Sequence, residues 1–390
     1  MQNKQYPLAS TTWGEEEYNA LHRVIESGNF TMGKEVSSFE QLFADYFSSN
    51  YCVMVNSGSS ANLLAVAALF YKKENPLKPG DEIIVPAVSW STTYMPLQQY
   101  GLSVKFVDID SKTLNIDTQK LEAAITENTK AIFAVNLLGN PNDFNKIEEI
   151  IGEKNIMLLE DNCEAMGAKY NGNYTGTFGI VGTFSTFFSH HISTMEGGMI
   201  LTDDEELYHI LLSLRSHGWT RHLPKQNKVT GRKSTDPFQE SFKFVLPGYN
   251  VRPLELSGAV GKEQLKKLSG FIRQRRANAQ VFEKNLSKID GITIQKEIGE
   301  SSWFGFALTL DEKQYQRKKI LQEFEKQGIE TRPVVSGNFL KNQALQYFSY
   351  SIGSDMTNAE NLDKNSFFIG NHHYDLSSQI KKVAENLSMM

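Results

Sequence analysis

The chain has 390 residues, of which 40% are hydrophobic and 22% are charged, and its formal net charge is −5. This composition is typical of a globular protein with a real core, and the negative charge does not favour a nucleic-acid partner. No apolar run is long enough to span a membrane, and the first ten residues lack the apolar core of a signal peptide. We therefore expect a cytoplasmic protein without a membrane segment.

Apolar runs of strand length alternate with amphipathic runs in the first part of the chain. The expected strands are Tyr51–Val55, Glu82–Pro86, Val104–Asp108, Ala131–Leu138 and Ile156–Glu160. The expected helices between them are Asn62–Phe70, Thr118–Ile125 and Asp143–Ile151. This β-α-β-α order predicts an α/β fold with a mostly parallel central sheet.

The second part of the chain changes its pattern. We expect strands at Gly182–Phe188 and Gly198–Leu201, a helix at Asp204–Ser216 and an exposed, basic loop at His222–Asp236. A helical pattern from about Leu254 to Leu286 is expected in two pieces, followed by a strand at Phe304–Leu310 and a helix at Glu312–Gln327. This restart predicts a large domain over residues 1–250 and a smaller C-terminal α+β domain over residues 251–390, which includes the long helical region.

A loop of small residues, Asn56-Ser57-Gly58-Ser59-Ser60-Ala61-Asn62, follows the first strand and opens an apolar helix. Free backbone N–H groups and the helix dipole at such a start favour a phosphate. Taken alone, the residues fit an ordinary N-cap serine with a glycine turn better. The spacing matches neither a Walker loop nor a dinucleotide-binding fingerprint.

Two further features follow strands. Glu160 and Asp161 end an apolar strand, where ligands of open α/β sheets bind, and an aspartate there can keep a pyridine nitrogen protonated. Trp90 follows another strand and could stack on a flat heterocycle. Solvated strand-end acids and a core tryptophan are the alternatives that these motifs leave open.

Further landmarks appear in order along the chain. They are the loop Ser185-Thr186-Phe187-Phe188-Ser189-His190-His191-Ile192-Ser193-Thr194-Met195-Glu196-Gly197-Gly198, then His217-Gly218, then Gly248-Tyr249-Asn250-Val251-Arg252. With the motifs above, the chain resembles the DegT/DnrJ/EryC-type sugar aminotransferase family over nearly its whole length. The resemblance implies an aspartate-aminotransferase-like fold, fold type I of the enzymes that use pyridoxal 5′-phosphate, with the cofactor bound by residues 1–250.

One position departs from the family's pattern. Family aminotransferases have a lysine six residues before the acid of Glu196-Gly197-Gly198, and this chain has His190 there, with no lysine between Lys169 and Lys225. The pattern is similar to that of family members that are 3-dehydratases. Histidine cannot form a stable imine, so the cofactor would be held without a covalent bond, and His190 would serve as a general base near neutral pH.

The resemblance implies the remaining roles. Pyridoxamine 5′-phosphate and then pyridoxal 5′-phosphate would be bound, with L-glutamate restoring the amine and with release of ammonia and 2-oxoglutarate. The substrate would be a nucleotide-linked 4-keto-6-deoxy sugar, GDP-4-keto-6-deoxy-D-mannose of the colitose pathway, which serves lipopolysaccharide O-antigen synthesis. Cofactor contacts would come from Gly58, Ser59, Trp90, Asp161, Glu164, Ser185 and Asn250, and glutamate contacts from His217 and Arg252. Asn250 would reach over from a partner subunit, which implies at least a homodimer.

Three other interpretations remain. A nucleotide-sugar aminotransferase would need the missing lysine. An iron–sulfur 3-dehydratase would need more cysteines than Cys52 and Cys163, which we expect to be buried free thiols. A catalytically inactive, cofactor-binding relative is disfavoured because Asp161, Trp90 and Asn250 are all present. The sequence contains no spaced Cys/His cluster that would predict a metal site.

Glu164 stands where the family more often has glutamine or histidine.

Overall fold

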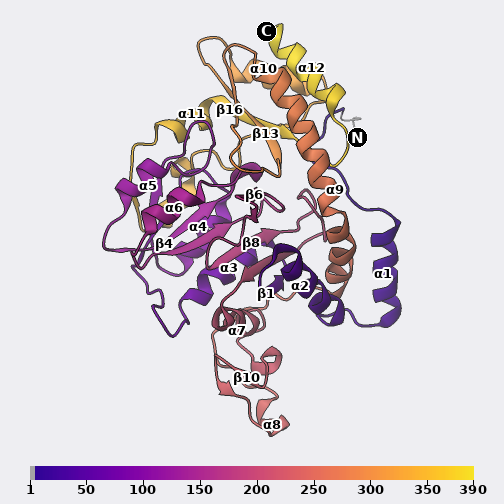
Figure 1. Ribbon diagram of the computed structural model, residues 1–390, viewed down its shortest axis with the longest axis vertical. Helices are drawn as coiled ribbons and strands as arrows, with labels where there is room; N and C mark the ends of the chain where they lie inside the picture. Colours follow the sequence, from indigo (N-terminus) through magenta and orange to yellow (C-terminus); the bar gives the residue numbers. More distant parts are fainter. Residues whose placement is uncertain (1–4) are drawn as a thin grey trace.

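The computed structural model describes residues 5–390 and is built around an eight-stranded sheet (Figure 1). The order across the sheet is β1-β9-β8-β5-β4-β2-β3-β15. Its strands are β1 (Tyr51–Val55), β2 (Glu82–Pro86), β3 (Ser103–Val107), β4 (Thr129–Val135), β5 (Met157–Asp161), β8 (Val181–Ser185), β9 (Gly198–Thr202) and β15 (Tyr350–Ile352). All neighbours run parallel except β9, which is antiparallel to both β1 and β8. The predicted mostly parallel α/β sheet is confirmed.

Helices cover both faces of this sheet, because its central strands are apolar on both sides. One face packs on α3 (Gly58–Leu69), α4 (Ser91–Gln99) and α7 (Glu205–Leu214). The other face packs on α5 (Thr118–Ala124) and α6 (Phe144–Ile151), and beside them on α2 (Lys34–Phe47). Short elements join these layers: the 3-10 turns η1 (Leu137–Gly139) and η2 (Thr220–His222) and the hairpin of β6 (Lys169–Tyr170) and β7 (Asn173–Tyr174).

The long helical region is one continuous helix, α9 (Glu255–Leu286), so the expected division into two pieces is wrong. Two of its glycines serve close packing and do not break it. A Cβ on Gly258 would lie 2.6 Å from the backbone nitrogen of Val36 in α2, and a Cβ on Gly261 would lie 2.4 Å from the ring of Phe39. Helices α1 (Glu15–Ser27) and α2 both pack on this first half of α9.

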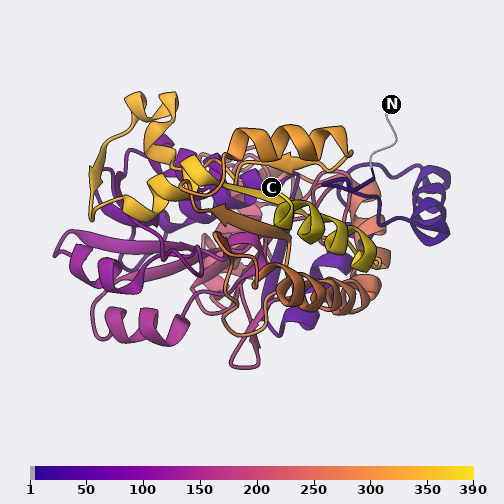
Figure 2. The same cartoon turned by 90° about the horizontal axis from the view of Figure 1, so that it is seen from above.

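A second, antiparallel sheet lies at the other end of α9, in the order β12-β13-β16-β14. Its strands are β12 (Ile292–Ile294), β13 (Gly305–Leu310), β14 (Thr331–Arg332) and β16 (Ser366–Gly370). Around it lie α10 (Arg317–Lys326), α11 (Thr357–Asn365) and α12 (Ser377–Ser388), with η3 (Phe339–Lys341) and η4 (Gln343–Tyr347) in the connection. Figures 1 and 2 show α12 beside α9.

The proposed boundary at residue 250 stays a prediction. Strand β15 belongs to residues 251–390 and yet pairs in parallel with β3 at the edge of the large sheet. The second part of the chain therefore contributes to both sheets.

An arm projects from the large sheet beyond α7 at the bottom of Figure 1. It contains β10 (Gln226–Asn227), β11 (Gly231–Arg232) and the single turn α8 (Pro237–Glu240). Most of the stretch expected as an exposed loop is exposed, although β10 and β11 pair as a short hairpin within it. Two phenylalanines of the arm, Phe238 and Phe242, are 88% and 76% exposed.

Candidate active site

Most of the residues predicted to form the site gather where strands β1, β2, β5 and β8 end. These strands point in the same direction, so their carboxyl ends meet at one edge of the sheet, which is where ligands bind in open α/β folds. Asp161 ends β5 and Ser185 ends β8, while Gly58 starts the helix after β1. Trp90 is the residue before α4, in the connection that follows β2.

Asp161 is buried, and three donors hold its carboxylate. Asn62 Nδ2 donates to Oδ2 over 2.8 Å, Thr93 Oγ1 donates to the same oxygen over 2.7 Å, and the Cys163 N–H donates to Oδ1 over 3.2 Å. The Asn62 amide is itself oriented by the Thr183 hydroxyl, which donates to its oxygen over 2.6 Å. A carboxylate with donors on both oxygens has a fixed direction and retains lone pairs for a further donor.

The neighbouring acid, Glu160, points to the opposite side because side chains alternate along a strand. It is fully buried, and its carboxylate accepts N–H groups of Gly176, Phe178 and Gly179 at 2.6, 2.6 and 2.9 Å. Burial raises its pKa, and these hydrogen bonds oppose the rise. Glu160 therefore organises the 176–179 loop and takes no part in the site.

The small-residue loop forms the start of α3 with Ser57 as its N-cap. The Ser57 hydroxyl accepts the N–H of Ser60 over 3.1 Å. The first N–H groups of a helix have no intrahelical acceptor, so those of Gly58 and Ser59 are available to an anion. A Cβ on Gly58 would lie 2.6 Å from the Cβ of Ser185, which explains why only glycine fits where these two segments meet.

His190 is partly buried, and its Nδ1 lies 2.8 Å from the carbonyl oxygen of Cys163. A carbonyl oxygen can only accept, so Nδ1 carries the proton and Nε2 presents a free lone pair. Burial lowers the pKa of His190 to about 4, the carbonyl opposes this, and the charge of Arg275 adds to it. The imidazole is therefore neutral at physiological pH and able to accept a proton at Nε2.

Glu164 is the second titratable group of unusual character. Burial raises its pKa to about 7, and the negative charge of Asp161 adds to this rise, while a hydrogen bond from the Leu138 N–H opposes it. That N–H donates to Oε2 over 3.0 Å. Near neutral pH the Glu164 carboxyl is thus protonated in a large fraction of molecules and can donate as well as accept a hydrogen bond.

Trp90 is 58% exposed, so much of its side chain is open to solvent. It is joined to the rest of the site through α4, because Thr93 holds Asp161 and Thr92 Oγ1 accepts from Ser59 Oγ over 3.2 Å. Gly58, Ser59, Trp90, Asp161, Glu164, Ser185 and His190 thus belong to one connected cluster.

His217, Asn250 and Arg252 form a second group. His217 adopts a positive φ of 61° and its N–H donates to the Tyr249 carbonyl over 2.7 Å, while Arg252 Nε donates to Asn250 Oδ1 over 3.0 Å. The backbone of this group is joined to the small-residue loop before α3, because the Asn56 N–H donates to the Val251 carbonyl. Within residues 5–390, no hydrogen bond or ion pair joins their side chains to the first cluster.

Sequence reasoning missed the residues that support the cluster. Asn62 was part of the loop motif without a role, and Thr93 carries no local signal because its partner Asp161 is 68 residues away. Phe304 was also missed, although its ring lies 5.0 Å from that of His190.

Residues 11–388 match the DegT/DnrJ/EryC1/StrS aminotransferase family, and the chain belongs to it. It is 62% identical over 380 residues to the GDP-4-keto-6-deoxy-D-mannose 3-dehydratase of Yersinia pseudotuberculosis, covering 97% of each chain. The solved structure of the Escherichia coli GDP-4-keto-6-deoxy-D-mannose-3-dehydratase with bound hydrated PLP matches with a TM-score of 0.97, 59% identity and coverage of 98% of this chain and 99% of that one.

A further solved structure is GDP-4-keto-6-deoxymannose-3-dehydratase with a trapped PLP-glutamate geminal diamine. It matches with a TM-score of 0.97 and 59% identity, covering 98% of this chain and 100% of that chain. The aminotransferase-like fold and the family resemblance expected from the sequence are confirmed.

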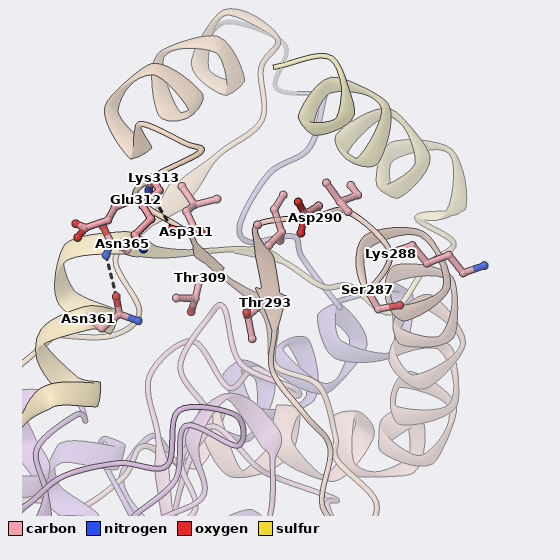
Figure 3. Close-up of a pocket in the computed structure, with 14 residues that line it drawn as sticks. Ser287, Lys288, Asp290, Thr293, Thr309, Asp311, Glu312, Lys313, Asn361 and Asn365 are labelled. Atoms are coloured by element: carbon pink, nitrogen blue, oxygen red, sulfur yellow. Dashed lines mark hydrogen bonds between the residues drawn. The ribbon is translucent and has the colours of Figure 1, made fainter.

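Two other features lie outside this site. A surface hollow between the end of α9, the β12–β13 hairpin and α11 is lined by residues such as Asp290, Thr309 and Asn361, and by none of the predicted site residues (Figure 3). None of the helices among residues 5–390 is long and apolar enough to cross a bilayer.

Proposed function

We propose that this protein is a nucleotide-sugar 3-dehydratase that uses pyridoxal and pyridoxamine 5′-phosphate and removes the C3 hydroxyl of GDP-4-keto-6-deoxy-D-mannose. The observation that carries the proposal is His190, which stands in the lysine position and whose Nδ1 is held by the carbonyl of Cys163, the residue whose N–H donates to Asp161. The relatives named GDP-4-keto-6-deoxy-D-mannose 3-dehydratase support the substrate and the reaction. We place the enzyme in the cytoplasm, in the synthesis of surface-polysaccharide sugars such as colitose.

The residues present fit the cofactor. The start of α3 offers N–H groups to a phosphate, and the Gly58–Ser185 contact leaves no room there for a side chain. Gly58, Ser59 and Ser185 would bind the phosphate, Asp161 would accept from the ring nitrogen, and Trp90 would stack on the ring. Glu164, with its raised pKa, could share a proton with the ring hydroxyl.

The protein's own groups define the chemistry that it can perform. The bound cofactor supplies an amine that condenses with a ketone and a ring that accepts electrons. Nε2 of His190 takes up a proton and can return it to the departing C3 hydroxyl, which leaves as water. Because histidine forms no stable imine, water must complete the release, and L-glutamate restores the amine. His217 and Arg252 would bind the carboxylates of glutamate.

The exposed position of Asn250 supports a shared site. Its side chain contacts Arg252 and is open to solvent, and the arm that precedes it exposes Phe238 and Phe242. We propose that the enzyme is a homodimer in which Asn250 of each subunit reaches the phosphate bound by the other.

The test is mass spectrometry of the product formed from GDP-4-keto-6-deoxy-D-mannose with pyridoxal 5′-phosphate and excess L-glutamate. We expect a sugar that lacks one oxygen, with one ammonia and one 2-oxoglutarate for each turnover. His190→Gln should abolish the reaction, whereas the exposed control His22→Gln should not. An amino sugar that retains its C3 hydroxyl would replace the proposal with a lysine-independent transaminase. Cofactor binding without turnover would favour an inactive relative or another nucleotide.

A further inference from the structure

A buried arginine without a carboxylate partner binds the segment that packs against His190. Arg275, in the middle of α9, is 3% exposed, and its Nη1 donates to the carbonyl oxygens of Asn371, Phe304 and Trp303 at 2.8, 3.1 and 3.4 Å. Its Nε is buried without a partner, and no ion pair is formed by it within the described part of the chain. A buried charge without a counter-charge acts strongly on its neighbours.

The carbonyls that Arg275 binds belong to a strained segment. Trp303 adopts a positive φ of 47°, and Leu138, in the facing turn η1, adopts a φ of 52°. The two turns hold each other, since the Phe304 N–H donates to the Leu138 carbonyl over 2.9 Å and the Ser302 N–H donates to the Gly139 carbonyl over 3.0 Å. Such conformations persist only when their surroundings enforce them, and they are concentrated at functional sites.

Both strained turns contact the candidate site. The Phe304 ring lies 5.0 Å from the ring of His190 and 5.7 Å from that of His191. The Leu138 N–H is the donor to Glu164. A displacement of the 302–304 segment would therefore move two groups together: the Phe304 ring that packs against His190, and the Leu138 N–H that donates to Glu164.

We propose that Arg275 is a positioning residue for His190: its guanidinium holds the strained 302–304 segment in place, so that Phe304 packs against the imidazole, and its positive charge has no carboxylate partner to offset its action on that ring. The inference rests on the proposed role of His190 as the base. It assigns to α9, which touches no reacting atom, control over the protonation of the catalytic imidazole.

Burial is the main cause of the lowered His190 pKa, and Arg275 is the positive charge that adds to it. Asp161, at the end of β5, opposes it by favouring the charged imidazole, as does the Cys163 carbonyl. The other titratable neighbours are His191, whose own pKa is lowered by burial and by Arg275, and Glu164. Without Arg275, Asp161 would be the principal charge acting on the imidazole, and the His190 pKa should rise.

The test is a titration of His190 by NMR in cofactor-free protein with isotope-labelled histidine, with the signal assigned by its loss in His190→Gln. Arg275→Met removes this positive charge and should shift the His190 pKa measurably upward, towards its ordinary value. Arg275→Lys keeps the charge and should keep the pKa low. Arg273→Met is the matched control, because that arginine, two residues earlier on the helix, is exposed and should leave the His190 pKa unchanged.

A His190 pKa that stays low in Arg275→Met, or that rises equally in Arg273→Met, would overturn the proposal. If Arg275→Met does not fold, Arg275→Gln, which retains an N–H donor for the carbonyls, replaces it under the same two criteria. In active holoenzyme the acid limb of the kcat profile should move with the pKa. Because the titration needs no substrate, a raised pKa together with a failed product assay would reject the 3-dehydratase and keep the role of Arg275.

Discussion

Replacing Glu164 by glutamine tests whether this carboxyl is protonated in the folded protein. Glutamine resembles the protonated acid, and its oxygen can still accept the Leu138 N–H. The folded pKa of about 7 lies above the ordinary value of 4.5, so folded protein binds more protons than unfolded protein between these values. The stability that the protonated carboxyl contributes is complete below pH 4.5 and is lost as the pH rises to about 7.

The magnitude follows from the same two values. A difference between 4.5 and about 7, at 1.36 kcal/mol for each pH unit, gives an upper limit of about 3 kcal/mol, which the partial exposure of Glu164 reduces. Denaturant unfolding of cofactor-free protein at several pH values should show Glu164→Gln gaining stability relative to wild type as the pH rises. The exposed control Glu127→Gln should run parallel to wild type. Parallel curves for Glu164→Gln would refute the reasoning.

Four further substitutions have definite expectations. Thr93→Val removes one of the donors to Asp161 and should weaken binding of pyridoxal 5′-phosphate by about tenfold or more, measured by absorbance titration; unchanged affinity would mean that the donor has no role. On α9, Gly258→Ala should destabilise the folded protein, because the added Cβ would collide with the backbone of α2. Gly270→Ala should stabilise the folded protein by about 0.5–1 kcal/mol in thermal unfolding, because only one side-chain atom lies within 4 Å of the added Cβ. Equal effects at the two glycines would contradict this packing. Glu255→Ala removes the carboxylate that accepts three N–H groups at the start of α2 and should cost about 1–2 kcal/mol, read as a lower Tm.

The sequence predicted the large sheet well because its strands carry a local signal. The apolar runs at Tyr51–Val55 and Glu82–Pro86 coincide with β1 and β2, and five further strands of this sheet were placed within a few residues. Strand β15 has no such signal, since it has three residues, is largely exposed and pairs with a strand almost 250 residues earlier. The expected break in α9 was wrong because the role of its glycines depends on a neighbouring helix.

The residues of the candidate site also differ in whether a local sequence signal could reveal them. The position of His190 relative to the Glu-Gly-Gly motif could be read from spacing, and the roles assigned to it and to the cofactor residues stay predictions. What spacing could not supply are the supports, such as Asn62, Thr93 and Arg275. Each acts on a group that is distant in sequence, across 99 residues from Asn62 to Asp161 and 29 from Arg275 to Phe304. These links exist only after the chain has folded.

The position of β15 has a consequence for synthesis of the protein on the ribosome. Strand β3 ends at Val107, and its outer neighbour begins at Tyr350. At about 5–20 residues per second, the ribosome needs on the order of 10–50 s to make the intervening chain. During that time the outer edge of β3 has unpaired backbone groups and can pair with another nascent chain. We therefore expect dependence on chaperones to be concentrated in this interval and to end when residues 350–352 emerge.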